Sequence, residues 1–193
     1  MSLSKKIFGY FLIVFSFSLI ILIGFPQVYS NNAAGRIDKT VKVESEFLKD
    51  EDAEVVLLYF GYVGCKNICT PAMNEISTIY KQLQSKNVKV YFLSLLDVEV
   101  NTVREYAMYF NKDFKGLKLP HKELEALKAK LRVQTTSSFS DANEINHAGH
   151  LYILERDKKN NLYEQKYIYT TRPLNTKVII EDIKVFLISK SKD

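Results

Sequence analysis

Apolar and polar residues follow one another along this chain in blocks that predict a mixed α/β domain. Apart from Glu54, residues 53–62 (AEVVLLYFGY) form a continuous apolar run between acidic residues and glycines, and residues 88–96 (VKVYFLSLL) form a second, mostly apolar stretch. Such runs are typical of strands that are buried on both faces of a sheet. Between them, apolar side chains recur at helical spacing from a start near Cys69: Met73, Ile76, Ile79, Tyr80 and Leu83.

The rest of the chain continues this alternation. Helical spacing predicts a second helix around residues 103–110 and a third around 124–131, after Pro120. Residues 150–155 and 162–169, separated by the turn DKKNN, predict a hairpin, and a closing helix is expected over 173–188. The order βα, βα, α, ββα is that of a thioredoxin-like three-layer α/β/α domain. In open α/β sheets, chemistry gathers at the carboxyl ends of parallel strands, which is where Cys65 and Cys69 follow the first strand.

The N-terminal pattern predicts a transmembrane helix ahead of this domain. Residues 7–25 carry no charge, and as a helix they would span ~28 Å, close to the thickness of a bilayer core. Because Lys5 and Lys6 precede them, we expect residues 1–6 in the cytoplasm and the domain on the far side of the membrane. A cleaved signal sequence is the alternative, but its apolar region is usually only ~7 to 15 residues long.

The remaining chain has the size of one domain. Residues 26–50 are mostly polar, with a short alternating patch at Val41 and Val43, and predict a tether that leads into the first strand or hairpin. Residues 51–193 then form the domain itself. The formal net charge of +5 comes from scattered lysines, so the sequence gives no indication of nucleic-acid binding.

Cys65 and Cys69 are the only cysteines in the chain. The predicted helix N-terminus favours an anion, so we expect the pKa of the Cys69 thiol to be lowered. One helical turn separates the two sulfurs, which brings them close enough for a disulfide or a shared metal ion. A structural staple would close only a very short loop, and short loops gain little from a disulfide. A staple, a redox couple and a pair of metal ligands all remain open from the residues alone.

A metal site requires a third donor, and the chain contains three histidines. His121 follows Pro120 at a helix start, where a solvated first-turn residue is expected. His150 lies at the start of a predicted strand and is expected to be packed or exposed there. His147 lies in the predicted loop before that strand, a place that abuts the thiol loop in thioredoxin-like folds.

Two segments resemble a known family. Residues 60–73 (FGYVGCKNICTPAM) resemble the FGYTxCPxxCP segment of the Sco (SenC-like) proteins, which are copper chaperones of cytochrome oxidase assembly. Residues 146–154 (NHAGHLYIL) resemble that family's DHSxxxYLI segment, in the same order along the chain. The likeness covers roughly residues 50–190.

The resemblance implies a copper site, a task and a location. Cys65, Cys69 and His147 would bind Cu(I) or Cu(II), and Cys65 and Cys69 would also form a redox disulfide. The implied task is delivery of copper to the copper-centre subunit of cytochrome c oxidase, or reduction of that subunit's cysteines. A copper donor or a thiol reductant is a further implied partner. Family members share one N-terminal membrane anchor, and the short lysine-bearing N-terminus favours a bacterial inner membrane with the domain in the periplasm.

Three departures from the family pattern stand out. Thr70 replaces the proline that follows the second cysteine, and residues 97–102 (DVEVNT) replace the family's DPxRDT stretch, which is implicated in docking to the oxidase. Asn146 stands where the family has an acid before the histidine ligand. Without that carboxylate near the histidine, we expect a lower metal affinity.

The chemistry of the donors agrees with copper. Thiolates are soft ligands and imidazole suits copper, so two sulfurs and one nitrogen can hold Cu(I), whereas structural zinc normally takes four ligands. The main alternative is a membrane-anchored thiol–disulfide oxidoreductase, and a disulfide-stapled binding domain is a third hypothesis. Oxidoreductases use Cys-x-x-Cys, whereas here three residues separate the cysteines. Thioredoxin-like reductases also resemble one another in a cis-proline opposite the cysteines, and residues 121–172 contain no proline. We therefore expect a metallochaperone rather than an enzyme.

Overall fold

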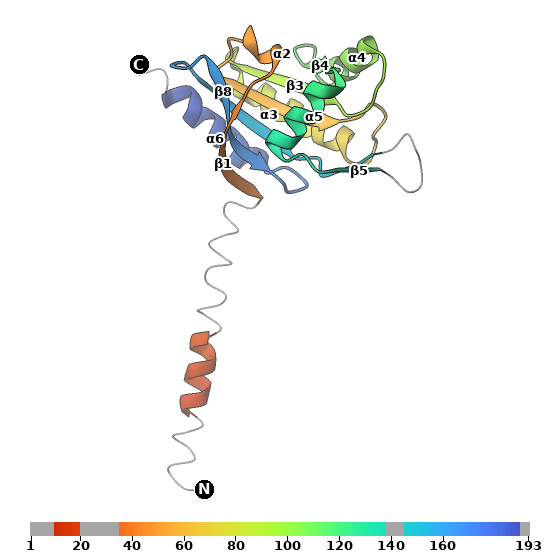
Figure 1. Cartoon of the computed structure of the whole chain (residues 1–193). Helices are drawn as coiled ribbons and strands as arrows, with labels where there is room; N and C mark the ends of the chain where they lie inside the picture. The colour runs from red at the N-terminus through yellow and green to blue at the C-terminus, as the bar shows by residue number, and fades with distance from the viewer. Residues whose placement is uncertain (1–9, 20–34, 138–144, 190–193) are drawn as a thin grey trace, which may run out of the picture. The chain divides into compact units, whose positions relative to one another are not determined.

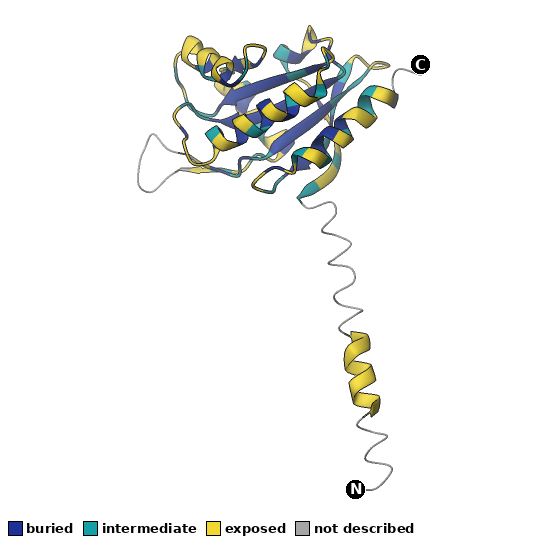
Figure 2. Cartoon of the chain, turned by 180° about the vertical axis from the view of Figure 1, so that it is seen from behind, coloured by how far each residue is buried: buried dark blue, intermediate teal, exposed yellow. Residues whose placement is uncertain are grey.

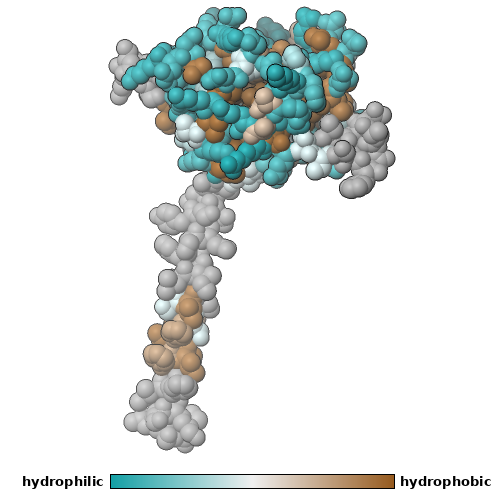
Figure 3. Space-filling model, viewed as in Figure 1, coloured by the Kyte–Doolittle hydropathy of each residue, from teal (hydrophilic) through white to brown (hydrophobic). Residues whose placement is uncertain are grey.

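The computed structural model describes residues 10–19, 35–137 and 145–189, and the chain divides into two compact units, Met1–Ala34 and Gly35–Asp193. The described part of the first unit is an exposed apolar helix over residues 10–19 (Figure 3). It covers the middle of the predicted anchor at 7–25, while residues 7–9 and 20–25 lie outside the described residues. None of the helices in the described ranges is both long enough and apolar enough to cross a bilayer.

The second unit is built around a six-stranded sheet with the order β1-β8-β7-β2-β3-β4 (Figure 1). Its strands are β1 (Arg36–Val43), β2 (Val55–Gly61), β3 (Val88–Ser94), β4 (Lys115–Leu117), β7 (Leu151–Asp157) and β8 (Leu162–Tyr169). β2, β3 and β4 are parallel, whereas β7 runs antiparallel to β2 and β8, and β8 runs antiparallel to β1. Two short strands, β5 (Thr135–Ser137) and β6 (Ile145–His147), form a separate antiparallel pair.

Helices cover both faces of the sheet, as the three-layer prediction requires. They are α2 (Glu46–Lys49), α3 (Cys69–Leu83), α4 (Val100–Phe110), α5 (His121–Leu131) and α6 (Thr176–Ser189). The side chains of α3, α4 and α6 share one apolar core with the sheet, and those of α2 and α5 share the other. Figure 2 shows the strands as the buried middle layer and the helices with exposed outer faces.

β2 lies at the centre of this arrangement because each of its residues is apolar and buried. Side chains alternate between the faces of a strand. Val55, Leu57 and Tyr59 therefore enter the core under α3, α4 and α6. Val56, Leu58 and Phe60 enter the core on the other face. The alternation is thus hidden in the sequence, where both sets appear as one continuous run.

The tether predicted over 26–50 is wrong for residues 35–50, which belong to the folded unit. β1 pairs with β8 along its length, from Arg36 opposite Tyr169 to Val43 opposite Tyr163. The alternating valine patch in this segment belongs to an edge strand with outward-facing polar residues, and Val43 and Leu48 are buried. Residues 26–34 lie outside the described residues.

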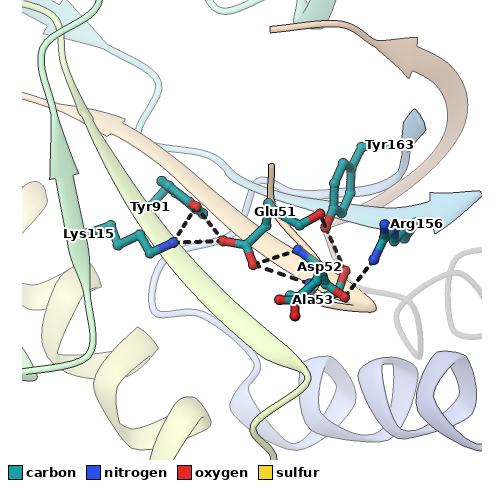
Figure 4. Close-up of polar contacts among 7 residues, drawn as sticks. All are labelled: Glu51, Asp52, Ala53, Tyr91, Lys115, Arg156 and Tyr163. Carbon is teal, nitrogen blue, oxygen red and sulfur yellow. Dashed lines mark hydrogen bonds and ion pairs between the residues drawn. The ribbon is translucent and has the colours of Figure 1, made fainter. Parts of the chain in front are cut away.

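A buried carboxylate fixes the chain just before β2 begins. Glu51 is 5% exposed, and its Oε2 accepts hydrogen bonds from Lys115 Nζ at 2.8 Å and from the hydroxyl of Tyr91 (Figure 4). Its Oε1 accepts the backbone N–H groups of Asp52 and Ala53 at 3.1 and 3.2 Å. Burial raises the pKa of Glu51, but the hydrogen bonds from Lys115, Tyr91 and the N–H of Ala53 have the larger combined effect and lower the pKa to about 2. The charged form is therefore the one that stabilises the fold.

Glu51→Gln is expected to lower the free energy of unfolding by roughly 2–4 kcal/mol, because it leaves buried donors without their charged acceptor. The folded-state pKa lies below the ordinary value, so the stabilisation is present above pH 4.5 and is lost as the pH falls toward 2. Urea unfolding at several pH values measures both effects. Glu125→Gln is the matched control, since its ion pair with Lys128 is at the surface and little change is expected. Equal losses in the two variants would contradict a special role for Glu51.

Candidate metal centre

The turn after β2 places the first cysteine. Gly64 adopts a φ of +92°, a conformation that side-chain-bearing residues rarely reach, and the chain then bends back so that the N–H of Cys65 donates to the carbonyl of Tyr62 at 3.3 Å. Cys69 begins α3, with Pro71 in the first turn, where backbone N–H groups have no partner within the helix. The predicted helix start at the second cysteine is confirmed.

Thr70 ties this turn together. Its N–H and its Oγ1 both donate to the carbonyl of Cys65, at 3.2 and 3.0 Å. The proline that the resemblance leads one to expect here could make neither bond, since it lacks both donors. Threonine at position 70 therefore gives the cysteine turn two hydrogen bonds that a proline could not make.

The sulfur of Cys69 lies directly over the end of β2. A Cβ atom added at Gly61 would lie 2.7 Å from Cys69 Sγ and 2.9 Å from the ring of Phe92, both closer than packed atoms approach. Gly61 is needed here for close packing and not for an unusual backbone angle. The glycine that ends the apolar run thus makes the space in which the second thiol sits.

The pairing of β7 with β2 brings His147 to the cysteines. The strands are antiparallel, with Leu151 opposite Tyr59, so the start of β7 lies beside the carboxyl end of β2. His147 lies four residues before Leu151 and ends β6, where the sequence predicted a loop. It pairs with Thr135 of β5 and is 7% exposed. The rings of Tyr59 and Tyr62 contact its ring edge-on.

Three donor atoms converge at this point. His147 Nε2 lies 3.2 Å from Cys69 Sγ and 3.9 Å from Cys65 Sγ, and the three atoms all lie within 4.8 Å of one another. Both cysteines are free thiols. An ion held at ~2.0–2.3 Å from each atom fits between donors with these separations. The residues that the sequence selected are therefore brought together.

The two thiols differ in the opposite sense to the prediction. The sulfur of Cys65 accepts hydrogen bonds from the thiol of Cys69, from His147 and from the N–H of Cys69, whose nitrogen is 3.3 Å away. These bonds hold the pKa of Cys65 far below the ordinary value, against the opposing effect of burial. That same thiol contact and burial raise the pKa of Cys69. The prediction that Cys69 carries the lowered pKa is wrong, because the first amide of α3 points at the sulfur one turn earlier.

The other nitrogen of His147 accepts the N–H of Gly149 at 3.1 Å. In the neutral ring the proton is then on Nε2 and faces the two sulfurs. Asn146, which replaces the expected acid, is exposed. A carboxylate or carbonyl acceptor usually holds this ring nitrogen in metal-binding histidines. Here a backbone donor takes its place.

The other two histidines lie apart from the donor cluster. His121 begins α5 and is exposed, as predicted. His150 is half-buried just before β7, with its ring 6.4 Å from that of Tyr152. Burial, together with the charges of Arg172 and His147, lowers the pKa of His150. Neither joins the Cys65, Cys69 and His147 cluster.

The site has one open side and a buried floor. A pocket of about 450 Å³ borders Cys65 and His147, with Tyr62, Lys66 and Ile68 on its wall. Cys69 is fully buried behind them, and Tyr59 lies among the buried core residues of the same face of the sheet. Tyr59 is thus part of the core on the face of the sheet where the two thiols lie.

We expect a thiolate on Cys65 in the reduced, metal-free chain at pH values well below the ordinary thiol pKa of 9, because hydrogen bonds stabilise its charged form. Absorbance at 240 nm during an acid titration measures it. Cys65→Ser should remove the low-pH thiolate. Cys69→Ser keeps a side-chain donor and the backbone N–H, so it should retain most of it. Loss in Cys69→Ser with persistence in Cys65→Ser would reverse the assignment.

Comparison with known proteins places these residues in context. The family model described as SCO1/SenC matches residues 43–186. An SCO2-like protein of Rickettsia felis is 22% identical over 157 residues, which are 72% of this chain and 73% of that protein.

Solved structures share the fold. The copper-bound ScoI of Arabidopsis thaliana has a TM-score of 0.60 and 17% identity, over 77% of this chain and 98% of that one. BsSco, described as a member of the Sco family of cytochrome c oxidase assembly proteins with a disulfide switch, has a TM-score of 0.55 and 18% identity, over 78% and 91%. The predicted thioredoxin-like α/β fold is thereby confirmed.

Proposed function

Because the chain belongs to the SCO1/SenC family, we propose that it binds copper through Cys65, Cys69 and His147 and assists assembly of the copper centre of a cytochrome c oxidase. The observation that carries the proposal is the convergence of two sulfurs and one imidazole nitrogen at the carboxyl end of β2. The copper-bound relative and the assembly role given for BsSco support it.

The donor set favours copper over other metals. Two thiolates and an imidazole are soft or intermediate ligands, which suit Cu(I) with three bonds. Structural zinc normally takes a fourth ligand. His150 is the nearest remaining histidine in sequence, and it lies outside the donor cluster. The same three atoms can also bind Cu(II) if a further ligand enters from the open pocket.

Copper is the cargo of this site. Cys65 is the ready thiolate, so the ion meets it first. Cys69 loses its thiol proton to solvent as its bond to copper forms. The ring proton of His147 moves from Nε2 to Nδ1, which frees Nε2 to bind copper and ends the hydrogen bond from Gly149. Release to a partner follows the reverse order by exchange with the partner's thiols. Oxidation of Cys65 and Cys69 to a disulfide removes both sulfur donors, so the thiol state of the pair sets whether copper can be held.

Titration of the reduced full chain in detergent with Cu(I), against a chromophoric chelator, tests the site. One equivalent is expected to bind tightly to the wild type. His147→Ala, Cys65→Ser and Cys69→Ser should each weaken binding by at least ~10-fold, since each removes one ligand or its support. His150→Ala and His121→Ala are matched controls and should bind as the wild type does. Undiminished binding in His147→Ala would contradict the proposed ligand set.

The alternative of a thiol–disulfide oxidoreductase has one observation in its favour, the low-pKa thiolate of Cys65. Burial counts against it, because Cys65 is 5% exposed and Cys69 is fully buried, which restricts attack on a protein disulfide. Turnover of a disulfide substrate by the wild type, together with copper binding that survives His147→Ala, would favour the oxidoreductase.

We also infer that the N-terminal segment tethers the domain to the periplasmic face of a bacterial inner membrane. The uncharged residues 7–25 after Lys5 and Lys6 support this placement. Expressed in a bacterium, the full chain should sediment with membranes, and protease added to spheroplasts should degrade the domain. Recovery of the intact chain in the cytosolic fraction would contradict the inference.

A further inference from the structure

The floor of the metal centre contains a hydroxyl group with no partner. Tyr59 is fully buried, and its Oη makes no hydrogen bond with any described residue. Buried polar groups are normally satisfied, because a donor taken out of water without a replacement bond is costly. An unsatisfied hydroxyl at a functional site suggests that it forms a hydrogen bond in another state of the protein.

The position of this hydroxyl points to the second thiol. Tyr59 and Gly61 are two residues apart on β2 and so face the same side, where Cys69 Sγ packs over Gly61. Tyr59 and Cys69 belong to the same buried core on this face of the sheet. Tyr59 also contacts His147 edge-on, with ring centroids 6.4 Å apart. It therefore lies behind two of the three donors.

The remaining neighbour of the hydroxyl can only donate. The guanidinium of Arg172 lies over the Tyr59 ring, 5.7 Å from its centroid. Arg172 Nη2 and Tyr59 Oη lie 2.7 and 3.2 Å from the place where a Cβ of Gly149 would be. A guanidinium has no acceptor, so it can bond only to the lone pairs of the tyrosine oxygen. The hydroxyl hydrogen is left for the sulfur.

We propose that Tyr59 is a positioning residue that donates its O–H to the sulfur of Cys69 when that sulfur holds copper. The inference rests on the proposed copper function. As the Cu–S bond forms, the S–H proton of Cys69 leaves to solvent, and the sulfur becomes a charged acceptor. The O–H of Tyr59 stays intact and turns toward it. No electron is transferred in this step.

The hydrogen bond has a consequence that a structural role would not have. A donor at a ligating thiolate withdraws charge from the sulfur, which favours Cu(I) over Cu(II) and tunes the redox potential of the site. Tyr59→Phe keeps the ring and removes only the hydroxyl. It should therefore make Cys69 a stronger donor, move the sulfur-to-Cu(II) charge-transfer band to longer wavelength and favour Cu(II).

The test compares three full-length chains in detergent: wild type, Tyr59→Phe and Tyr152→Phe. Tyr152 is a matched control, since it is buried on β7 in the core on the opposite face of the sheet. For Tyr59→Phe we expect a red-shifted band and a change of roughly tenfold in the ratio of Cu(II) to Cu(I) affinity, the size of one hydrogen bond to a charged group. Tyr152→Phe should match the wild type.

A metal-free measurement completes the design. The Tyr59 hydroxyl has no partner in the metal-free chain, so Tyr59→Phe should leave the urea midpoint of the reduced, copper-free protein unchanged or raised. A lowered midpoint, or an unshifted band with an unchanged affinity ratio, would overturn the inference while the copper function stands. Failure of the wild type to bind copper would instead overturn the proposed function itself.

Discussion

The site depends above all on the antiparallel pairing of β7 with β2. With Leu151 opposite Tyr59, the chain that enters β7 must pass the end of β2, and this passage puts His147 next to cysteines 82 and 78 residues away. A shift of one residue in this register would turn every side chain of β7 to the other face of the sheet. The buried side chains of β7 fix the register, because Leu151 and Ile153 fill one core and Tyr152 and Leu154 fill the other, and a shift would exchange the two sets. Metal-site geometry is thus a consequence of core packing.

The second determinant is where the helix amide points. In the sequence, the start of α3 at Cys69 directs attention to the thiol of that residue. In the fold, the N–H of Cys69 donates to the sulfur of Cys65 instead, and the thiol of Cys69 donates to that same sulfur. The pair therefore shares one proton unequally. This asymmetry makes Cys65 the first ligand to bind copper. The donor strength of the Cys69 sulfur is then set by the buried groups around it, Tyr59 among them.

The two ends of β2 serve different purposes. At its amino end, Glu51 binds groups from β3 and β4 through its side chain, and its backbone carbonyl accepts the hydroxyl of Tyr163 from β8. At its carboxyl end, Gly61 leaves room for a sulfur. Copper can reach the site through the open pocket beside Cys65, while Cys69 on the buried side is held in place by the core.

The sequence alone predicted the central elements of the domain and the three candidate donors. Continuous apolar runs, helical spacing and the two cysteines are local features, so residues 53–62, 88–96 and the start of α3 could be predicted directly. The place of His147 in the loop before a strand made it a candidate, and the resemblance then selected it as the ligand. Only the tertiary structure decided that 36–43 is an edge strand, that Cys65 carries the thiolate and that Tyr59 and Cys69 share one buried core. These depend on partners far away in the chain, and a periodic pattern contains no information about which distant groups its side chains will meet.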